Sequence, residues 1–261
     1  PGLAGIVAPV MNHQRRGMKI NAILTVQELH MSYQAVLFDL DGTLLDTLDD
    51  LANAGNRTLA ARALPVHPVA AYRYFVGDGI ATLVERILPP ERRSVEEIGQ
   101  SVADFQREYA ANWDEHSASY PGIAPMLDAL VAGGLRLAVL SNKPEDFTRL
   151  CVERLLSPWP FDPVFGQRAG MPKKPAPAGA LAAAQALQLA PREILYVGDT
   201  SIDMRTARAA GMDPVGVLWG FRGAEELQAA GAARLISDPA ELVPIALSPT
   251  PLTKEDCRAR L

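Results

Sequence analysis

Aspartates gather in the segment AVLFDLDGTLLDT, residues 35–47, directly after an apolar run. Asp39 and Asp41 stand two residues apart at the end of the run from Ala35 to Phe38, which predicts a buried strand. Like charges this close raise each other's cost of ionising, and burial adds to that cost. A bound cation, or a proton held for general acid–base catalysis, would relieve it. The segment therefore predicts a metal site or a proton-transfer site.

Two further polar residues follow predicted strands. Ser141 comes directly after the apolar stretch 135–140, and Asp199 follows closely after 194–197. Each is followed by a loop and the start of a predicted helix. In open parallel sheets, ligands bind beyond the carboxyl ends of the strands. Three separate segments are therefore expected to deliver oxygen atoms to one edge of a sheet.

The elements that position these residues alternate between strands and helices. After residue 119, predicted strands at 135–140, around 164–165, at 194–197 and at 215–218 alternate with predicted helices at 125–132, 145–156, 177–187 and 202–210. This alternation predicts an α/β fold with a parallel sheet covered by helices on both faces. Between residues 50 and 118 the pattern is helical throughout, at 48–63, 79–88 and 94–112, which indicates a helical insertion.

Four motifs together resemble those of the haloacid dehalogenase superfamily of phosphotransferases. They are DLDGT at 39–43, LSN at 140–142, KKPAP at 173–177 and GDTSID at 198–203. The resemblance implies a Rossmann-like parallel-sheet core with an inserted α-helical cap domain. The expected domains are a core of residues 32–49 and 119–247, a cap of residues 50–118, an N-terminal extension 1–31 outside the fold, and a tail 248–261.

The resemblance also implies roles for the motif residues. Asp39 would attack phosphorus and form an aspartyl-phosphate, and Asp41 would protonate the leaving oxygen and then activate water. Ser141 and the amide of Asn142 would donate to phosphate oxygens. Lys174 would supply fixed positive charge, with Lys173 as the alternative lysine. The supporting residues would be Asp203, Gly42 and Thr43.

The expected cofactor is Mg²⁺, a hard cation that prefers oxygen ligands and is often held by a few carboxylates and the substrate phosphate. By resemblance, its ligands are Asp39, the main-chain carbonyl of Asp41, and Asp199. The metal would account for the charge on Asp39, whereas Asp41 would carry the proton. A carboxylate at position 41 accompanies phosphoester chemistry in this family, which argues against a dehalogenase. Asp46, Asp49 and Asp50 are interpreted as solvated residues of a helix start.

Other segments resemble the phosphoglycolate phosphatase branch of the superfamily, namely YFVGDGIATLVERIL at 74–88, YPGI at 120–123, LSNKP at 140–144 and GVLWGFRG at 216–223. In that branch the cap closes over the substrate, and closure excludes water. The turn Gly77-Asp78-Gly79 would face the active site, or else it only starts a helix. Arg73 or Lys143 could meet a substrate carboxylate.

The leading hypothesis is a Mg²⁺-dependent phosphatase for a small phosphate ester, most of all 2-phosphoglycolate. The alternatives are a sugar-phosphate phosphatase or phosphosugar mutase on the same scaffold, and a non-catalytic binding module. The net charge of −5 argues against a nucleic-acid partner. No apolar run has the length of a membrane span, and two distant cysteines among 261 residues favour a reducing cytoplasm. The pattern gives no oligomeric state.

Overall fold

A six-stranded parallel sheet forms the centre of the structure, a computed structural model that describes residues 33–248. The strand order is β5-β4-β1-β6-β7-β8, and every neighbouring pair is parallel. The strands are β1 (Ala35–Phe38), β4 (Arg136–Pro144), β5 (Phe161–Gln167), β6 (Ile194–Gly198), β7 (Asp213–Val217) and β8 (Arg234–Ile236). The predicted α/β fold class is confirmed. The predicted extension 1–31, and the predicted tail beyond residue 248, lie outside the described residues.

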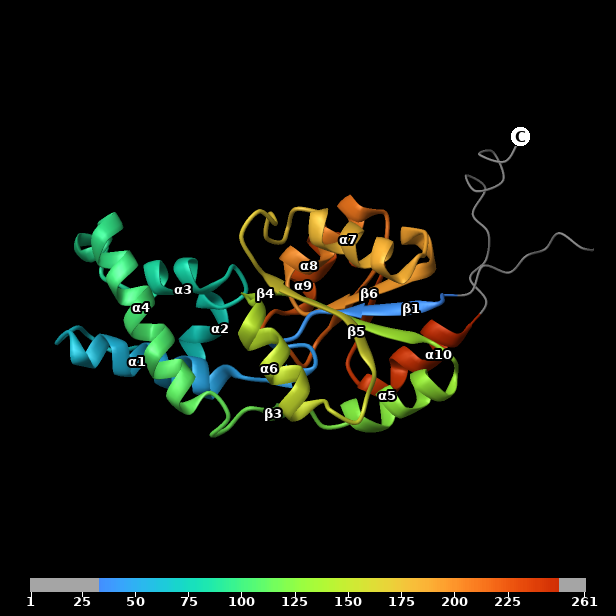
Figure 1. Ribbon diagram of the computed structural model, residues 1–261, viewed down its shortest axis with the longest axis horizontal. Helices are drawn as coiled ribbons and strands as arrows, with labels where there is room; N and C mark the ends of the chain where they lie inside the picture. Colours follow the sequence, from blue (N-terminus) through green and yellow to red (C-terminus); the bar gives the residue numbers. More distant parts are fainter. Residues whose placement is uncertain (1–32, 249–261) are drawn as a thin grey trace, which may run out of the picture. The chain divides into compact units, whose positions relative to one another are not determined.

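Both faces of the sheet are covered by helices, as the uninterrupted apolar run of β1 predicts. Val36 and Phe38 face one hydrophobic cluster, while Ala35 and Leu37 face another. The first face packs against α5, α6 and α10, and the second against α7 and α8, with α9 beside α8 (Figure 1). These helices are α5 (Ile123–Ala132), α6 (Glu145–Leu155), α7 (Ala178–Leu187), α8 (Ser201–Ala210), α9 (Ala224–Ala229) and α10 (Leu242–Leu247).

Four helices form a separate group in the segment between β2 (Leu45–Asp46) and β3 (Ala118–Ser119), and they lie together to the left of the sheet in Figure 1. They are α1 (Leu48–Ala61), α2 (Tyr72–Phe75), α3 (Ile80–Ile87) and α4 (Val95–Asn112). We refer to this group as the cap. The short strands β2 and β3 pair antiparallel, with Leu45 opposite Ser119. The helical character of the insertion matches the sequence pattern, whereas the domain boundaries at residues 50 and 118 stay a prediction.

Apolar side chains of the cap continue the hydrophobic cluster of the sheet. Leu83 of α3 and Phe105 of α4 belong to the same buried cluster as Val36 and Phe38 of β1. Burial of apolar surface is the main favourable term in packing. The cap is therefore held against the sheet by a shared core as well as by polar contacts.

The structure corrects three details of the sequence-based expectations. Strand β4 does not end at Leu140 but continues to Pro144, so Ser141 lies within the strand. Asp50 is not solvated, because only 1% of its surface is exposed. The pattern also missed short elements, namely β2, β3, β8, α2, α9 and α10.

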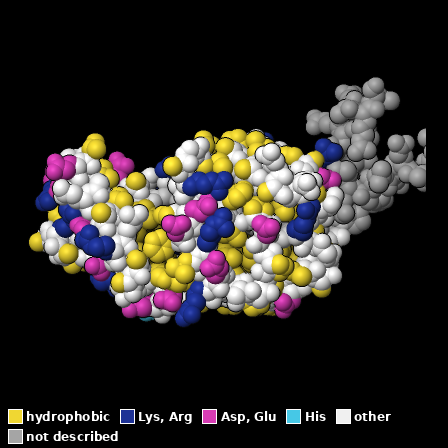
Figure 2. Space-filling model, in the orientation of Figure 1, with side chains coloured by type: hydrophobic (Ala, Val, Ile, Leu, Met, Phe, Trp, Pro, Cys, Tyr) yellow, Lys and Arg dark blue, Asp and Glu magenta, His cyan; other side chains and the backbone are white. Residues whose placement is uncertain are grey.

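The surface gives no single-sign charged area in the view of Figure 2, where Lys and Arg side chains alternate with Asp and Glu side chains over the sheet domain. No helix within residues 33–248 combines the length and the apolar composition that crossing a membrane requires. The Cys151 thiol is free and buried.

Candidate active site

The carboxyl ends of three adjacent strands bring the predicted polar residues together. Strand β1 lies between β4 and β6, so Asp39 and Asp199, which follow β1 and β6, lie at one sheet edge with Ser141, which is in the C-terminal half of β4. All three side chains are buried, with less than 8% of each residue exposed. The convergence expected from the parallel topology is therefore present.

A cluster of three buried carboxylates forms the centre of this edge. Asp39, Asp199 and Asp203 each offer an oxygen within 4.8 Å of the other two. Burial raises the pKa of Asp39 to about 7, and repulsion from Asp203 adds to that rise while the Lys174 ammonium opposes it. Burial, followed by repulsion from Asp203 and Asp39, also raises the pKa of Asp199 well above its usual range. Fully ionised, the cluster would carry more negative charge than its neighbours balance.

Lys174 contributes the positive charge that directly contacts the cluster. Its Nζ lies 2.8 Å from Asp39 Oδ1 and 2.7 Å from Asp203 Oδ1. Burial lowers the pKa of Lys174, but the two carboxylates outweigh burial and the net pKa lies above the usual range. The lysine is thus a permanent cation. Within the described residues, no other Lys or Arg forms an ion pair with these three carboxylates.

Asp203 fixes both Lys174 and the start of α8. Its Oδ2 accepts hydrogen bonds from the Thr200 main-chain N–H (3.1 Å) and from the Thr200 hydroxyl (2.7 Å). Thr200 precedes the helix, so this is a capping interaction that satisfies an otherwise unpaired donor at the helix start. The other carboxylate oxygen, Oδ1, accepts a hydrogen bond from Lys174 Nζ. The Asp203 side chain therefore links the start of α8 to the ammonium group of Lys174.

Asp199 is held by residues from two distant loops. Its Oδ2 accepts the Phe221 main-chain N–H at 2.7 Å, and its Oδ1 accepts the Thr43 hydroxyl at 3.3 Å. Gly42 lies directly against this carboxylate with φ +85°, and a Cβ atom there would overlap Asp199 Oδ2. Position 42 therefore requires glycine both for its backbone conformation and for space.

Asp41 lies in different surroundings from Asp39. Its two oxygens accept hydrogen bonds from Lys143 Nζ at 2.9 and 3.1 Å, and Oδ1 also accepts the Thr47 hydroxyl at 2.8 Å. Burial lowers the pKa of Lys143, but Asp41 and its other neighbours more than reverse the effect, so the ammonium stays charged. The Asp41 side chain is thus held by a cation and a hydroxyl, and it is not one of the three clustered carboxylates.

Asn142 connects the sheet edge to the cap. Its side-chain N–H groups donate to the main-chain oxygens of Gly77 (3.0 Å) and Lys174 (3.1 Å), and its Oδ1 accepts the Lys174 N–H (2.8 Å). The side-chain amide is therefore fully engaged, and a phosphate contact from Asn142 would come from its main chain. The neighbouring Ser141 hydroxyl accepts the Lys143 N–H at 3.2 Å and lines the pocket described next.

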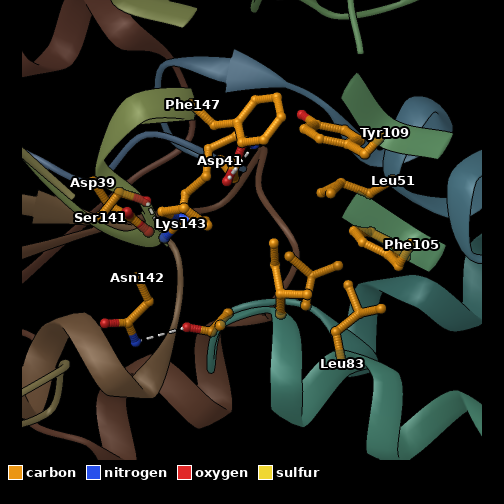
Figure 3. Close-up of a pocket in the computed structure, with 15 residues that line it drawn as sticks. Asp39, Asp41, Leu51, Leu83, Phe105, Tyr109, Ser141, Asn142, Lys143 and Phe147 are labelled. Atoms are coloured by element: carbon orange, nitrogen blue, oxygen red, sulfur yellow. Dashed lines mark hydrogen bonds and ion pairs between the residues drawn. The ribbon is translucent and has the colours of Figure 1, made fainter. Parts of the chain in front are cut away.

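A pocket lies between the sheet edge and the cap (Figure 3). Its volume is about 40 Å³. Asp39, Asp41, Ser141, Asn142 and Lys143 line the sheet side. The cap side is lined mostly by apolar groups, namely Leu51, Val76, Ile80, Leu83, Phe105 and Tyr109, and Phe147 of α6 adds a ring from the sheet domain.

The turn Gly77-Asp78-Gly79 faces this pocket through its glycines. Both glycines line the pocket, with φ values of +116° and +86° respectively. The Asp78 carboxylate points elsewhere and pairs with Arg86 at 2.6 Å. Helix α3 begins directly after the turn, so the turn both lines the pocket and starts a helix.

Two choices between cations that the sequence left open have clear geometric answers. Lys173 donates to the cap at Asp78 O (2.7 Å) and Thr82 (3.2 Å), whereas Lys174 contacts Asp39. Arg73 donates to the main-chain oxygen of Gly220 and is not among the pocket-lining residues, whereas Lys143 lines the pocket. Lys174 and Lys143 are therefore the two ammonium groups at the site.

Three residues of this region were missed by sequence reasoning. Thr47 has one usable signal, a hydroxyl directly before a predicted helix. The Phe221 N–H offers none, because a main-chain donor is independent of residue type. Tyr109 lies four residues after Phe105 on an apolar helix face, and that pattern is equally typical of a packing residue.

Comparison with known families and proteins gives consistent matches. The family model of the haloacid dehalogenase-like hydrolases matches residues 36–217. A phosphoglycolate phosphatase from Pseudomonas putida is 33% identical over 229 residues, covering 86% of this chain and 84% of that protein. A phosphoglycolate phosphatase from Chromobacterium violaceum is 35% identical over 213 residues, covering 80% of this chain and 94% of that protein.

Solved structures match over a similar range. The crystal structure of a protein from Lactobacillus delbrueckii subsp. bulgaricus has a TM-score of 0.78 and 29% identity, with 83% of this chain and 99% of that chain covered. The crystal structure of a predicted phosphoglycolate phosphatase from Haemophilus somnus has a TM-score of 0.73 and 26% identity, with 82% and 97% covered.

Proposed function

The chain belongs to the haloacid dehalogenase-like hydrolase family, and from that premise we propose that it is a Mg²⁺-dependent phosphatase for a small phosphate monoester, 2-phosphoglycolate first. The observation that carries the proposal is the buried group of three carboxylates and one lysine at the sheet edge, directly beside the pocket. Nucleophilic carboxylates occur in phosphoryl-transfer enzymes. The choice of 2-phosphoglycolate as the substrate rests on the relatives, which are phosphoglycolate phosphatases.

The residues at the sheet edge fit a divalent cation. Three buried carboxylates share one ammonium group, and the raised pKa of Asp39, about 7, follows from burial and then from repulsion by Asp203. A cation with oxygen ligands would relieve that repulsion, and Mg²⁺ prefers such ligands. Asp39, Asp199 and the main-chain carbonyl of Asp41 would hold it, with Asp203 in support. When bound, it would supply positive charge facing the phosphoryl oxygens.

The two aspartates of the first motif would divide the chemistry. A carboxylate oxygen of Asp39 attacks phosphorus, the bond to the ester oxygen breaks, and an aspartyl-phosphate forms. Asp41 gives a proton to the departing oxygen and afterwards takes one from the water that hydrolyses the aspartyl-phosphate. Lys143 and Thr47 hold the Asp41 carboxylate in place through hydrogen bonds to its oxygens.

Positive and hydrogen-bonding groups of the chain would hold the phosphoryl group. Lys174 keeps its charge beside Asp39, so it can stabilise negative charge as it shifts among the phosphoryl oxygens. Ser141 adds a hydroxyl from the next strand. The Asn142 side chain positions the Gly77 turn and the Lys174 main chain, which aligns cap and core around the pocket.

The size of the pocket supports a small substrate. The cavity of about 40 Å³ between sheet edge and cap has room for a few water molecules, so a small organic group next to the phosphoryl group is compatible with it. Lys143 faces this space and Arg73 does not, so Lys143 is the cation that we place near a substrate carboxylate.

Steady-state assays on a panel of phosphate esters, with and without Mg²⁺, test the proposal. We expect release of inorganic phosphate that depends on Mg²⁺ and a higher kcat/KM for 2-phosphoglycolate than for sugar phosphates. Faster turnover of sugar phosphates would contradict the substrate. Isomerised phosphosugar in place of free phosphate would indicate a mutase, and a folded protein without Mg²⁺-dependent turnover would indicate a binding module.

A further inference from the structure

The cap side of the pocket carries one polar side-chain atom among apolar groups. Val76, Ile80, Leu83 and Phe105 present hydrocarbon to the cavity. Tyr109 of α4 also lines it, and its hydroxyl is the exception. Ligand pockets are commonly apolar with a few placed polar groups that fix the orientation of the ligand. The Tyr109 hydroxyl is in the position of such a group.

This hydroxyl is buried without a partner. Tyr109 is 1% exposed, and its hydroxyl oxygen makes no hydrogen bond with any residue in the range 33–248. Buried polar groups in folded proteins are nearly always paired, because an unmade hydrogen bond costs free energy. Burial also raises the pKa of the phenol, so the group stays protonated and can donate.

The surroundings of Tyr109 indicate what it could bind. The Lys143 ammonium lies 4.8 Å from the centre of the tyrosine ring and is itself bonded to Asp41. In Figure 3 the hydroxyl end of the ring is turned toward Asp41 and Phe147, across the cavity from the Asn142 side. A donor beside an ammonium group favours a negatively charged acceptor, since hydrogen bonds to ionised partners are the stronger ones.

We propose that Tyr109 is a substrate-binding residue of the cap, and that its hydroxyl donates a hydrogen bond to a carboxylate oxygen of the substrate's organic group. This inference rests on the proposed function and extends it to the residue that distinguishes carboxylated esters from others. The phosphoryl end would lie at Asp39, and the carboxylate would lie beside Tyr109 and Lys143.

A packing role is the competing explanation. The Tyr109 ring stacks on Phe105 with centroids 6.0 Å apart and lies 5.3 Å from Phe147. Phenylalanine would preserve both contacts and remove only the hydroxyl. The substitution Tyr109→Phe therefore separates the two roles.

The experiment compares kcat/KM of wild type and Tyr109→Phe on 2-phosphoglycolate and on ethyl phosphate, which lacks the carboxylate. We expect the ratio of the two kcat/KM values to fall roughly 10- to 100-fold in the variant, the loss typical of one hydrogen bond to a charged group. Most of this fall should come from a higher KM for 2-phosphoglycolate rather than from a lower kcat. The thermal midpoint should change little, because the hydroxyl makes no hydrogen bond within the described residues.

Tyr72→Phe is the matched control. Tyr72 is also a buried tyrosine of the cap, but its hydroxyl donates to Asn56 Oδ1 at 3.0 Å and does not line the pocket. The substitution Tyr72→Phe should lower the thermal midpoint and leave the ratio of the two kcat/KM values unchanged. An unchanged ratio in Tyr109→Phe, with normal wild-type turnover, would overturn the inference alone. A wild type without Mg²⁺-dependent turnover of 2-phosphoglycolate would overturn the proposed function and this inference with it.

Discussion

Two identical side chains, Asp39 and Asp41, have opposite electrostatic surroundings although only one residue separates them. Asp39 lies among carboxylates, and Lys174 is the cation that contacts it. The Asp41 carboxylate accepts hydrogen bonds from the Lys143 ammonium group and the Thr47 hydroxyl. The motif predicted both residues, but the lysine that pairs with each one lies more than a hundred positions along the chain. The difference between their surroundings is therefore a property of the fold.

Replacement of Asp39, the proposed nucleophile, tests the covalent route. Asp39→Asn removes the attacking oxygen's charge, so we expect turnover to be abolished while circular dichroism shows an unchanged fold. The protein should be checked by mass spectrometry for deamidation back to aspartate. Substantial turnover by intact Asp39→Asn protein would argue against an aspartyl-phosphate.

Replacement of Asp41 tests proton transfer. Asp41→Asn cannot give or take the proton, and we expect kcat to fall by roughly 10²- to 10⁴-fold, the contribution typical of general acid–base catalysis. Asp49→Asn is the control, because Asp49 is an exposed aspartate of helix α1 near the same loop. Equal kinetics in the two variants would remove Asp41 from the mechanism.

Elements with strong local signals were predictable, and short or edge elements were not. Strand β1 was predicted with its observed limits, since its four residues are all apolar and buried. Strand β8 has three residues at the sheet edge, too few for a periodic pattern. Strand β4 extends through Ser141, Asn142 and Lys143, whose polar side chains suggested a loop, and its register with β5 shifts there.

A tie between two elements at the base of the cap was also missed. The Asp50 carboxylate, in α1, accepts the main-chain N–H groups of His116 and Ser117, the Ser117 hydroxyl (2.7 Å) and the His116 ring nitrogen (2.9 Å). Burial opposes ionisation of Asp50, but these donors prevail and lower its pKa. The hydrogen bond to Asp50 raises the pKa of His116. The sequence pattern indicates only that Asp50, like Asp46 and Asp49, is a solvated residue of a helix start, and the burial of Asp50 contradicts this.

This tie predicts a pH-dependent contribution to stability. The depressed pKa of Asp50 stabilises the fold above about pH 4, the unfolded value, and that contribution is lost as the pH falls. The raised pKa of His116 stabilises the fold below about pH 6.5, and that contribution is lost as the pH rises through the folded value. His116→Gln should therefore lower the thermal midpoint more at pH 5.5 than at pH 8.5.

Asp50→Asn is the companion variant. It should destabilise the protein at both pH values, by about 2 kcal/mol or more, because a buried acceptor of several hydrogen bonds is lost. The measurement is the midpoint of thermal unfolding across the pH range. A His116→Gln effect of equal size at both pH values would contradict the tie.

At the scale of the whole molecule, the contacts between cap and sheet domain link residues that are distant in sequence. Arg222 donates to the main-chain oxygen of Arg73, Arg73 donates to that of Gly220, and Asn142 donates to Gly77. Main-chain oxygens accept all three hydrogen bonds, and every residue type has such an oxygen, so the sequence pattern could not predict these contacts. The carboxylate cluster likewise exists only after β1 and β6 are adjacent.

Because the cluster draws on separate segments, a bound cation should stabilise the folded chain as a whole. We expect Mg²⁺ to raise the thermal midpoint by several degrees, since a ligand at 100 times its Kd adds about 2.7 kcal/mol. The gain should be larger at pH 8 than at pH 6, because the pKa of Asp39 is raised to about 7 by burial and protons compete with the metal below it.

Asp199→Asn provides the control for that measurement. The variant loses one proposed ligand and one buried charge, so its midpoint should respond less to Mg²⁺ and should not fall much without it. An equal Mg²⁺ response in wild type and Asp199→Asn, measured by thermal unfolding with EDTA as the reference, would place the ion elsewhere.

The pairing of β2 with β3 has a consequence for how such a protein can diversify. Leu45 lies opposite Ser119, so the chain departs for the helical segment and comes back at neighbouring points. Related proteins can therefore lengthen, shorten or exchange the helical segment. Such a change affects the chain at two adjacent points and leaves the parallel strands in place. The two aspartates that we propose as catalytic can then stay unchanged while the residues around the organic group of the substrate vary.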